Sequence, residues 1–369
     1  MRAKKLASNI GLIFGTRPEI IKLSPIIRHL ERTKQRYFVL HTGQHYSYAM
    51  DQLFFEELEL PEPKHKLSVH LGPSMGHGHH TGRMLAVVEE ILQKEKPSVV
   101  MVQGDTNSVL AGALVAAKMG GVKVAHVEAG LRSYDREMPE EINRIIADHL
   151  SDYLFPPTQL SKRILLSEGI DAKKIHVTGN TIVDALQENL KIAKKSKRPF
   201  PYGLREGAPF FLMTMHRQEN VDFKPRLASI LQGLDKVIKH FKRPLLFPAH
   251  PRTAKMIKHF GLQLPAGLRL LEPAGFLDFL RLEAAAELIL TDSGGVQEEA
   301  CILRVPCVTL RTTTERPETV EAGGNRIAGF TPDGIFKAAK RIAGIRRSWK
   351  NPFGDGKAAE RIVRICSRS

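Results

Sequence analysis

A serine, two glycines and two glutamates follow an apolar segment late in the sequence. In LTDSGGVQEEA, Ser293, Gly294 and Gly295 stand where a helix is expected to begin. Free backbone N–H groups at a helix start bind anions, and glycines let an anion approach closely because they have no Cβ. Glu299 lies one helical turn further on, where its carboxylate could accept hydrogen bonds from a ribose diol. The stretch therefore predicts a phosphate or nucleotide site, with an ordinary helix cap as the alternative.

Charged residues follow other apolar segments in the same way. In GTRPEIIK, Arg17 and Lys22 lie at an expected helix start, where they could reach an anion, although solvated surface charges would give the same pattern. Asp105 follows the apolar stretch VVMVQ and a glycine, and Glu128 follows VKVAHV directly. A buried acid needs a partner or a function, because removing a charge from water is costly. We therefore expect Glu128 to do chemistry, and Asp105 too unless it only caps a helix.

Two further stretches combine acids with cations. MPEEINR is predicted to open a helix in which Glu140 and Arg144 lie four residues apart, a spacing that also suits an ordinary helical ion pair. TMHRQEN places His216 and Arg217 after an apolar segment, where they suit phosphate binding or proton transfer. Cations and carboxylates thus recur in the same relation to apolar segments along the chain.

The segments that must position these residues show the alternating strand and helix patterns of an α/β protein. Short apolar stretches typical of buried strands alternate with amphipathic stretches typical of helices. The alternation pauses near residues 191–207 and then restarts, which predicts two such domains. The expected strands are 9–14, 37–42, 97–103, 122–127, 209–215, 244–250, 268–273, 286–292 and 305–310.

We expect an N-terminal domain over residues 1–190, a C-terminal domain over 191–355 and a last helix at about 356–369 that packs back on the first domain. Ligands of open parallel sheets bind at the carboxyl ends of the strands. Two Rossmann-like domains facing a central cleft would bring both sets of strand ends to one ligand. The chemistry is therefore expected between the domains.

Composition restricts the partners and the compartment. A net charge of +16 favours anionic ligands, but the basic residues are spread along the chain without a nucleic-acid motif, so we expect no nucleic-acid partner. No stretch reaches the roughly 20 apolar residues of a membrane span, so no membrane is expected either. Cys301, Cys307 and Cys366 are an odd number without disulfide or metal spacing, which indicates a reducing compartment. The cytoplasm fits best.

Cofactor motifs are missing from the sequence. MGHGHHTG contains His77, His79 and His80, but no acid or cysteine stands at ligand spacing, so we expect a polar loop rather than a metal site. The same stretch misses the dinucleotide-binding glycine pattern by one residue. The sequence therefore predicts neither a metal nor a nicotinamide cofactor.

Taken together and in order, nine motifs resemble those of the non-hydrolysing UDP-N-acetylglucosamine 2-epimerases: GTRPEIIK, TGQH, QGDTNS, HVEAGLRS, MPEEINR, TGNTIVDAL, HRQEN, LTDSGGVQEEA and TTTERPE. The resemblance covers almost the whole chain, up to NPFGDGKAAERI. It implies a fold similar to the GT-B glycosyltransferases and a homodimer. It also implies interconversion of UDP-GlcNAc and UDP-ManNAc without a metal or nicotinamide.

The resemblance further implies roles for single residues. Asp105, Glu128 and Glu140 would supply the carboxylates around the sugar. His216 would lie near the pyrophosphate and would also be catalytic, by helping UDP to leave. Glu299 would bind the ribose. The full set implied to bind the substrate, besides His216, is Arg17, Lys22, Arg144, Phe279, Ser293, Gly294, Gly295, Glu299 and Arg316.

Elimination is the route that fits these residue types. The C2 hydrogen of UDP-GlcNAc is not next to a carbonyl, so its direct removal is difficult. If UDP leaves C1 with help from the cations while a carboxylate takes the C2 proton, the product is 2-acetamidoglucal, to which UDP adds back. The alternatives are an epimerase of another UDP-2-acetamido sugar (a 2,3-diacetamido uronic acid or a 6-deoxy sugar), a GT-B glycosyltransferase and an RNA-binding protein.

Overall fold

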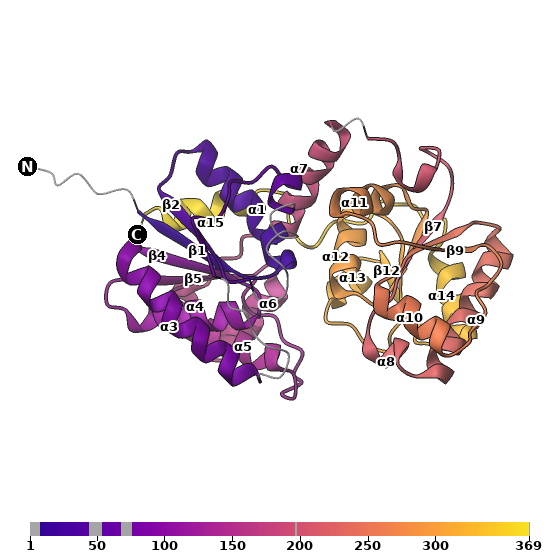
Figure 1. The fold of residues 1–369 in the computed structure, drawn as a ribbon, viewed down its shortest axis with the longest axis horizontal. Coiled ribbons are helices and arrows are strands. Elements are labelled where there is room, and N and C mark those ends of the chain that lie inside the picture. The colour runs from indigo at the N-terminus through magenta and orange to yellow at the C-terminus, as the bar shows by residue number, and fades with distance from the viewer. Residues whose placement is uncertain (1–7, 44–53, 68–75, 196–197, 369) are drawn as a thin grey trace, which may run out of the picture. The chain divides into compact units, whose positions relative to one another are not determined.

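The chain forms two compact units, and each is described here by itself. The computed structural model describes residues 8–43, 54–67, 76–195 and 198–368, so the end of the TGQH motif lies outside the described residues. Unit 1 comprises residues 1–188 and 353–369, and unit 2 comprises residues 189–352 (Figure 1).

Unit 1 contains a six-stranded parallel sheet with the order β3-β2-β1-β4-β5-β6. The strands come from the apolar segments of the first half of the chain, because a parallel sheet is covered on both faces and its strands must be apolar throughout. Their bounds are β1 Ile10–Phe14, β2 Tyr37–His41, β3 His65–Lys66, β4 Val99–Gln103, β5 Lys123–Val127 and β6 Tyr153–Phe155.

The helices of unit 1 cover its sheet. The last helix, α15, packs against α1, so the C-terminal segment returns to the first unit. The stretch with three histidines, expected as a polar loop, instead forms the first turn of α3, which packs on α4. The helices are α1 Arg17–Arg32, α3 His77–Glu95, α4 Asn107–Lys118, α5 Pro139–Leu150, α6 Gln159–Ser167, α7 Thr181–Lys195 and α15 Ala358–Cys366, with a 3₁₀ turn η1 at Ala172–Lys174.

Unit 2 has a second six-stranded parallel sheet, with the order β12-β11-β10-β7-β8-β9. Its strands are β7 Phe211–Thr214, β8 Leu245–Pro248, β9 Leu268–Leu271, β10 Leu288–Thr291, β11 Cys307–Thr309 and β12 Asn325–Ile327. Its helices are α8 Gln218–Val221, α9 Lys224–Phe241, α10 Pro251–His259, α11 Phe276–Ala285, α12 Gly294–Leu303, α13 Pro317–Glu321 and α14 Pro332–Ile342, with a 3₁₀ turn η2 at Pro201–Gly203.

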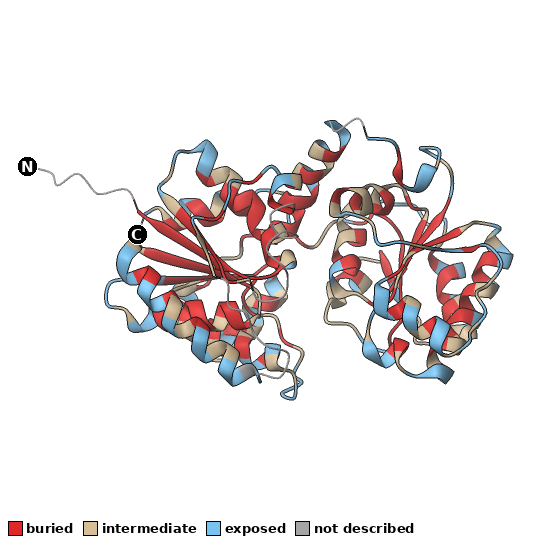
Figure 2. Cartoon of the chain, viewed as in Figure 1, coloured by how far each residue is buried: buried red, intermediate tan, exposed pale blue. Residues whose placement is uncertain are grey.

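The buried residues are concentrated in the two sheets and on the helix faces that cover them. Most strand residues of both units are buried, whereas helices are buried on one side and exposed on the other (Figure 2). Unit 2 has apolar clusters on both faces of its sheet, one around Phe247 and one around Phe210. The predicted α/β class with two parallel sheets is confirmed.

Candidate active site

Three neighbouring strands of unit 1 end in predicted site residues. In the sheet, β4 lies between β1 and β5. Arg17 begins the helix after β1, Asp105 lies in the turn after β4, and Glu128 comes directly after β5. Because the three strands are parallel, their carboxyl ends share one edge of the sheet, and this edge is where ligands of such sheets bind.

Glu128 is a buried acid on an uncommon backbone. Its φ of 69° lies in the left-handed region, which residues other than glycine seldom adopt, and the residue is only 6% exposed. Its two carboxylate oxygens lie 2.7 and 2.5 Å from Lys22 Nζ, and the side-chain amide of Gln103 donates a further hydrogen bond. Such strained, buried charges cluster at functional sites, because the surrounding structure has to hold them in place.

Asp105 forms an ion pair with Arg144, which α5 supplies. Arg144 Nε and Nη2 lie 2.9 and 2.7 Å from Asp105 Oδ2, and Nη1 lies 2.6 Å from Glu141 Oε2. The helix that follows Asp105 is capped by Thr106, whose hydroxyl accepts a backbone hydrogen bond. Asp105 therefore serves as a charge partner at the sheet edge and not as the cap of α4.

The two adjacent glutamates of α5 have different surroundings. Glu140 is exposed in the first turn, whereas Glu141 is 1% exposed and accepts hydrogen bonds from Ser133, Tyr134 and Arg144. Burial alone would raise the pKa of Glu141, but the bonds from Ser133, Tyr134 and Arg144 outweigh it and lower the pKa. Arg144 is thus held by the residue three positions before it, and the catalytic role predicted for Glu140 stays a prediction.

A second ionic network lies in the interior of unit 1. His126 Nδ1 lies 2.7 Å from Asp148 Oδ1, and its Nε2 lies 2.8 Å from the backbone oxygen of Gly104. Asp148 Oδ2 accepts hydrogen bonds from Gly130 N at 3.1 Å and pairs with Arg132 Nη1 at 2.7 Å. Burial alone would lower the pKa of His126, but Asp148 and the Gly104 carbonyl raise it. Because both ring nitrogens face acceptors, His126 carries two protons and a positive charge.

This network connects the turns that hold the two predicted acids. His126 bonds to the residue before Asp105, and Asp148 bonds to the backbone two residues after Glu128. Sequence reasoning assigned no role to His126, which lies in the stretch VKVAHV, and missed Asp148. The signal was the buried face of α5, on which Glu141, Arg144 and Asp148 recur at helical spacing.

Glu19 is a buried acid that sequence reasoning also missed. Its carboxylate accepts hydrogen bonds from the backbone N–H groups of Gly15 and Thr16 at 2.9 and 2.7 Å, and from the hydroxyls of Thr16 and Thr106 at 2.8 and 2.7 Å. Burial raises the pKa of Glu19 to about 7, although these hydrogen bonds oppose the rise. Glu19 thereby ties the turn after β1 to the turn after β4. The T-x-x-E pattern of a capping box in TRPE would have indicated it.

In unit 2 the predicted anion site is the start of α12. Ser293 is the N-cap, and its hydroxyl accepts a hydrogen bond from Val296 N at 3.5 Å. Gly294 and Gly295 do not have positive φ values, and a Cβ on them would meet its nearest atoms only at 3.9 and 3.8 Å. The protein's own packing therefore does not demand glycine here, whereas a ligand close to the backbone would.

A buried aspartate organises the neighbouring strand end. Asp292 accepts hydrogen bonds from the backbone N–H groups of His216 and Arg217 at 3.0–3.2 Å and from Asn220 Nδ2 at 3.0 Å. The His216 side chain is 48% exposed, with Nδ1 3.5 Å from Asp292 Oδ1. Burial lowers the pKa of His216, and the neighbouring Arg217 and His250 lower it further against the attraction of Asp292. The ends of β7 and β10 are therefore held together as one loop cluster.

Known proteins match this chain over almost its full length. The family model described as UDP-N-acetylglucosamine 2-epimerase matches residues 28–367. The UDP-N-acetylglucosamine 2-epimerase of Methanocaldococcus jannaschii is 56% identical over 362 residues, which cover 96% of this chain and 98% of that protein. The chain belongs to the UDP-N-acetylglucosamine 2-epimerase family.

Solved structures support the same assignment. The crystal structure of the M. jannaschii UDP-GlcNAc 2-epimerase in complex with UDP-GlcNAc and UDP has a TM-score of 0.87 at 55% identity and covers 98% of this chain and 100% of that one. A second enzyme of the family, the UDP-2,3-diacetamido-2,3-dideoxy-D-glucuronate 2-epimerase of Pseudomonas aeruginosa, is 40% identical over 359 residues, 96% of this chain and 98% of that protein. The predicted family and the GT-B-like fold class are confirmed.

The remaining positions predicted from the epimerase family lie around α12 in unit 2. Arg316 caps α13, and its Nε lies 3.1 Å from Glu298 Oε1. Phe279 on α11 is half-buried against the apolar cluster that includes Val296. Glu299 on α12 is partly buried beside another acid, Glu283. Their contacts with a nucleotide stay predictions.

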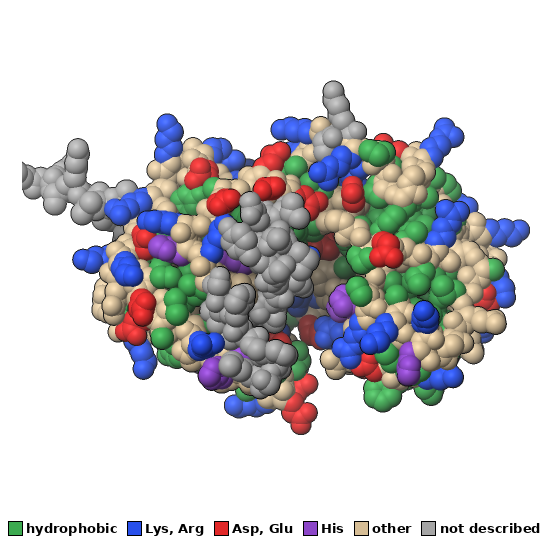
Figure 3. Space-filling model, viewed as in Figure 1, with side chains coloured by type: hydrophobic (Ala, Val, Ile, Leu, Met, Phe, Trp, Pro, Cys, Tyr) green, Lys and Arg blue, Asp and Glu red, His purple; other side chains and the backbone are tan. Residues whose placement is uncertain are grey.

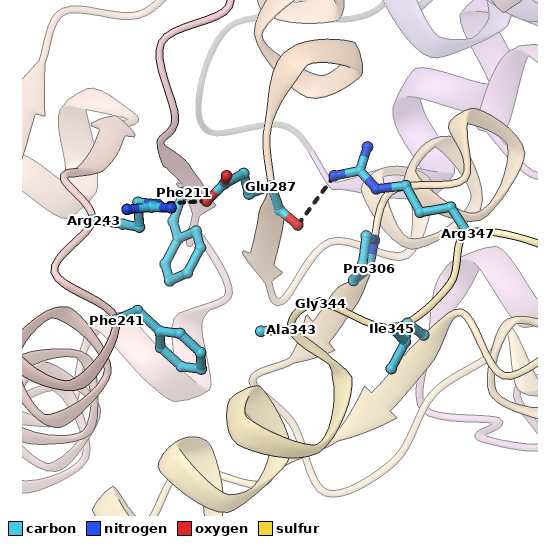
Figure 4. Close-up of a pocket in the computed structure, with 9 residues that line it drawn as sticks. All are labelled: Phe211, Phe241, Arg243, Glu287, Pro306, Ala343, Gly344, Ile345 and Arg347. Atoms are coloured by element: carbon cyan, nitrogen blue, oxygen red, sulfur yellow. Dashed lines mark hydrogen bonds and ion pairs between the residues drawn. The ribbon is translucent and has the colours of Figure 1, made fainter.

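A cavity of about 320 Å³ lies elsewhere in unit 2. Its lining includes Phe211 at the start of β7, Glu287 just before β10 and Pro306 just before β11 (Figure 4). Arg243 pairs with the Glu287 carboxylate at 2.7 Å, and the guanidinium of Arg347, which follows α14, donates a hydrogen bond to the Glu287 backbone oxygen. These are the amino ends of the strands, opposite the edge at which α/β sheets bind ligands, so the cavity is not part of the candidate site.

Surface charge, helix hydropathy, metal ligands and cysteines bear on the predicted partners and compartment. Lys and Arg side chains are scattered over the visible face of both units (Figure 3). Among the described residues, no helix combines the length and apolar character needed to cross a membrane, and no group of three or more His, Cys, Asp and Glu side chains is placed to hold a metal ion. The three cysteines are buried and free.

Proposed function

We propose that this chain interconverts UDP-GlcNAc and UDP-ManNAc by eliminating UDP from C1 and adding it back to 2-acetamidoglucal. The observation that carries the proposal is the pair of ion pairs at the sheet edge of unit 1, Lys22 with Glu128 and Arg144 with Asp105. These four residues stand at the positions that the family motifs predict.

Unit 1 has the groups that proton transfer at C2 requires. As UDP leaves, positive charge develops on the sugar ring and the C2 proton becomes acidic enough for a carboxylate to accept. Asp105 and Glu128 are buried or partly buried acids on neighbouring turns, and Glu140 is exposed on the helix that supplies Arg144. Inversion at C2 needs a proton acceptor on one face of the sugar and a donor on the other, which more than one carboxylate can supply. Lys22 and Arg144 place a positive charge beside Glu128 and Asp105.

Unit 2 has the groups that a nucleoside diphosphate requires. The free N–H groups at the start of α12 and the hydroxyl of Ser293 suit phosphate oxygens, and the helix dipole favours their negative charge. His216 and Arg217 lie on the loop that Asp292 holds and are suited to the diphosphate. Glu299 is suited to the ribose and Phe279 to the uracil. UDP is thereby stabilised as a leaving group and retained for readdition.

The decisive experiment is proton NMR of UDP-GlcNAc with the purified protein in D₂O, with a chelator present and no added cofactor. We expect UDP-ManNAc to form and deuterium to enter C2, because the abstracted proton exchanges with solvent before readdition. Product without deuterium at C2 would indicate internal transfer of the hydrogen and contradict elimination. Turnover that begins only after NAD or a divalent ion is added would contradict the cofactor-free mechanism.

A second candidate substrate is a UDP-2,3-diacetamido uronic acid. The P. aeruginosa relative of that name, at 40% identity, favours it as the alternative. The same NMR assay with UDP-GlcNAc, the diacetamido uronate and a 6-deoxy UDP-2-acetamido sugar ranks the substrates by turnover. A rate at least tenfold higher with the uronate would replace UDP-GlcNAc as the proposed substrate.

The assembly and the compartment are also proposals. The family resemblance supports a homodimer, which light scattering on the purified protein would measure. Three buried free cysteines support a reducing compartment, and we propose the cytoplasm. Fractionation of cells that contain the protein would test that location.

A further inference from the structure

Glu283 is an acid buried in unit 2 without an obvious structural reason. It lies in the last turn of α11, which packs on α12, and it is 1% exposed. Among the described residues, its Oε1 is buried and has no hydrogen-bond partner. An ionised carboxylate in such a place would lose its hydration without compensation, so the neutral acid is the stable form.

The group that faces Glu283 is the Glu299 carboxyl on α12. The two side chains are within hydrogen-bonding reach of each other, and burial together with the charge of Glu299 raises the pKa of Glu283 well above its usual value. Two carboxyl groups can share a hydrogen bond only if one of them is protonated. Because Glu283 is the more buried of the two and its pKa is raised, its carboxyl is the donor in this hydrogen bond.

The two cysteine thiols near Glu283 are uncharged. Cys307 on β11 lies near Glu283, and Cys301 on α12 lies near Cys307. Burial raises the pKa of Cys301 to about 12 and that of Cys307 further, so both thiols are neutral near pH 7. The Arg281 and Asp278 side chains of α11 contact each other, and Arg281 also bonds to Pro199 O. Glu299 is therefore the charged group that determines the state of Glu283.

We propose that Glu283 is a positioning residue that donates a hydrogen bond to Glu299 and orients it toward the ribose of UDP. This inference rests on the proposed UDP site and adds a residue that the family motifs do not contain. The hydrogen bond restricts the Glu299 rotamers. The ribose contact is then prepared before UDP arrives.

The arrangement has a consequence for pH. A buried acid with a raised pKa is protonated near neutrality and loses its proton only at alkaline pH. When Glu283 ionises, the pair carries two negative charges, and repulsion displaces Glu299 from the orientation that the ribose requires. UDP affinity therefore falls at alkaline pH through this pair.

The test is titration calorimetry of UDP and of 2′,3′-dideoxy-UDP, which lacks the ribose diol, against the wild type, Glu283→Gln and Glu283→Met. Gln keeps a donor for Glu299 and cannot ionise, whereas Met fills the space without a donor. Glu287→Gln, an acid of the same unit that pairs with Arg243, is the control. Thermal unfolding of each variant separates a loss of fold from a loss of affinity.

We expect Glu283→Met to weaken UDP binding at neutral pH by about threefold to tenfold, the range for one hydrogen bond. The affinity for 2′,3′-dideoxy-UDP should be the same in Glu283→Met as in the wild type, because no ribose hydroxyl is present to lose. Glu283→Gln should match the wild type near pH 7 and retain more of its affinity than the wild type at about pH 9.5.

Two results would overturn the inference. Equal losses of UDP and dideoxy-UDP affinity in Glu283→Met would mean that Glu283 only supports the packing of α11 on α12. Unchanged UDP affinity in Glu283→Met, with Glu299→Ala impaired, would mean that Glu299 needs no positioning partner. A wild type that binds no UDP would instead refute the proposed function, so the two failures are distinguishable.

Discussion

The strand ends of unit 1 hold side-chain ion pairs, whereas those of unit 2 hold a helix start and a loop organised by one buried acid. In unit 1, Glu128 and Asp105 each face a cation at hydrogen-bonding distance. In unit 2, Asp292 uses its oxygens on backbone N–H groups and Asn220, and the start of α12 offers its own N–H groups outward.

The difference corresponds to the two tasks in the proposed function, which are proton transfer and anion binding. Proton transfer needs side chains whose charge can change, and unit 1 supplies several carboxyl groups with neighbouring cations. Anion binding needs fixed donors that do not titrate, and backbone N–H groups meet that requirement. In the proposed function, two sheets of the same topology would serve different chemistry through the residues at their strand ends.

The largest expected effect, and the strongest test of this comparison between the two units, is on turnover. We expect Asp105→Asn, Glu128→Gln and Glu140→Gln each to lower the epimerisation rate by about 10²- to 10⁴-fold, the range for a lost acid or base, with UDP affinity nearly unchanged. Initial rates and UDP calorimetry measure both quantities. The control is Glu89→Gln, an exposed acid on α3. A Glu128→Gln enzyme with normal turnover would make that ion pair purely structural.

The adjacent acids of α5 sharpen the comparison within unit 1. We expect Glu141→Gln to lower the free energy of unfolding by about 1.5–3 kcal/mol, because Glu141 is buried and accepts charged and backbone hydrogen bonds, while Glu140→Gln leaves it unchanged. Urea denaturation measures this quantity.

The same pair gives a pH dependence. Because the folded pKa of Glu141 is lowered, its stabilisation is present above the unfolded pKa of about 4.5 and is lost as pH falls through the folded value. The wild type should therefore lose more stability on acidification than Glu141→Gln. Equal losses in the two proteins would contradict the assigned hydrogen bonds.

The anion site of unit 2 is tested through UDP affinity. We expect Glu299→Ala to weaken UDP binding by about 1–3 kcal/mol, the effect of a lost hydrogen bond to a charged group, without a change in unfolding temperature. Glu321→Gln, an exposed acid at the end of α13, is the matched control. Calorimetry that finds normal UDP affinity in Glu299→Ala would reduce the start of α12 to an ordinary capped helix.

The smallest expected effect is proton uptake at His216. Its lowered pKa leaves the side chain mostly neutral near pH 7, and a diphosphate beside it would raise the pKa. UDP binding should therefore take up a fraction of one proton, and the uptake should grow as pH falls from about 8 to about 6.5. Calorimetry in buffers of different ionisation enthalpy measures the uptake. His216→Asn should abolish it, and persistence of the same uptake in that variant would assign the proton to another group.

The fold was largely predictable because parallel strands are buried on both faces. A stretch such as VVMVQ in β4 is apolar at successive positions, and this pattern recurs ahead of amphipathic helices in both halves of the chain. The prediction of a loop for the histidine stretch at the start of α3 was wrong. Glycines and histidines have weak helix propensity, but packing on α4 decided the structure.

The candidate site was predictable where a short sequence motif is enough to indicate the local structure and its chemistry. Ser293 and the two glycines after it indicate a helix start that is open to an anion. An acidic residue that directly follows an apolar strand, such as Glu128, indicates a buried acid. The choice between Glu140 and Glu141 was not local, since helix spacing allows Arg144 to pair with either. The rotation of α5 against the sheet, set by packing, turned Glu141 inward.

By itself, then, the sequence determined the two α/β units, the charged residues at the strand ends and the family, because each depends on residues near one another in the chain. Only the tertiary structure decided which charges meet. Lys22 reaches Glu128, His126 reaches Asp148, and Arg144 reaches Asp105, because parallel strand order and helix packing join segments that are far apart in sequence. Buried charges are stable only beside such partners, so the pattern of pairs is a property of the packed fold.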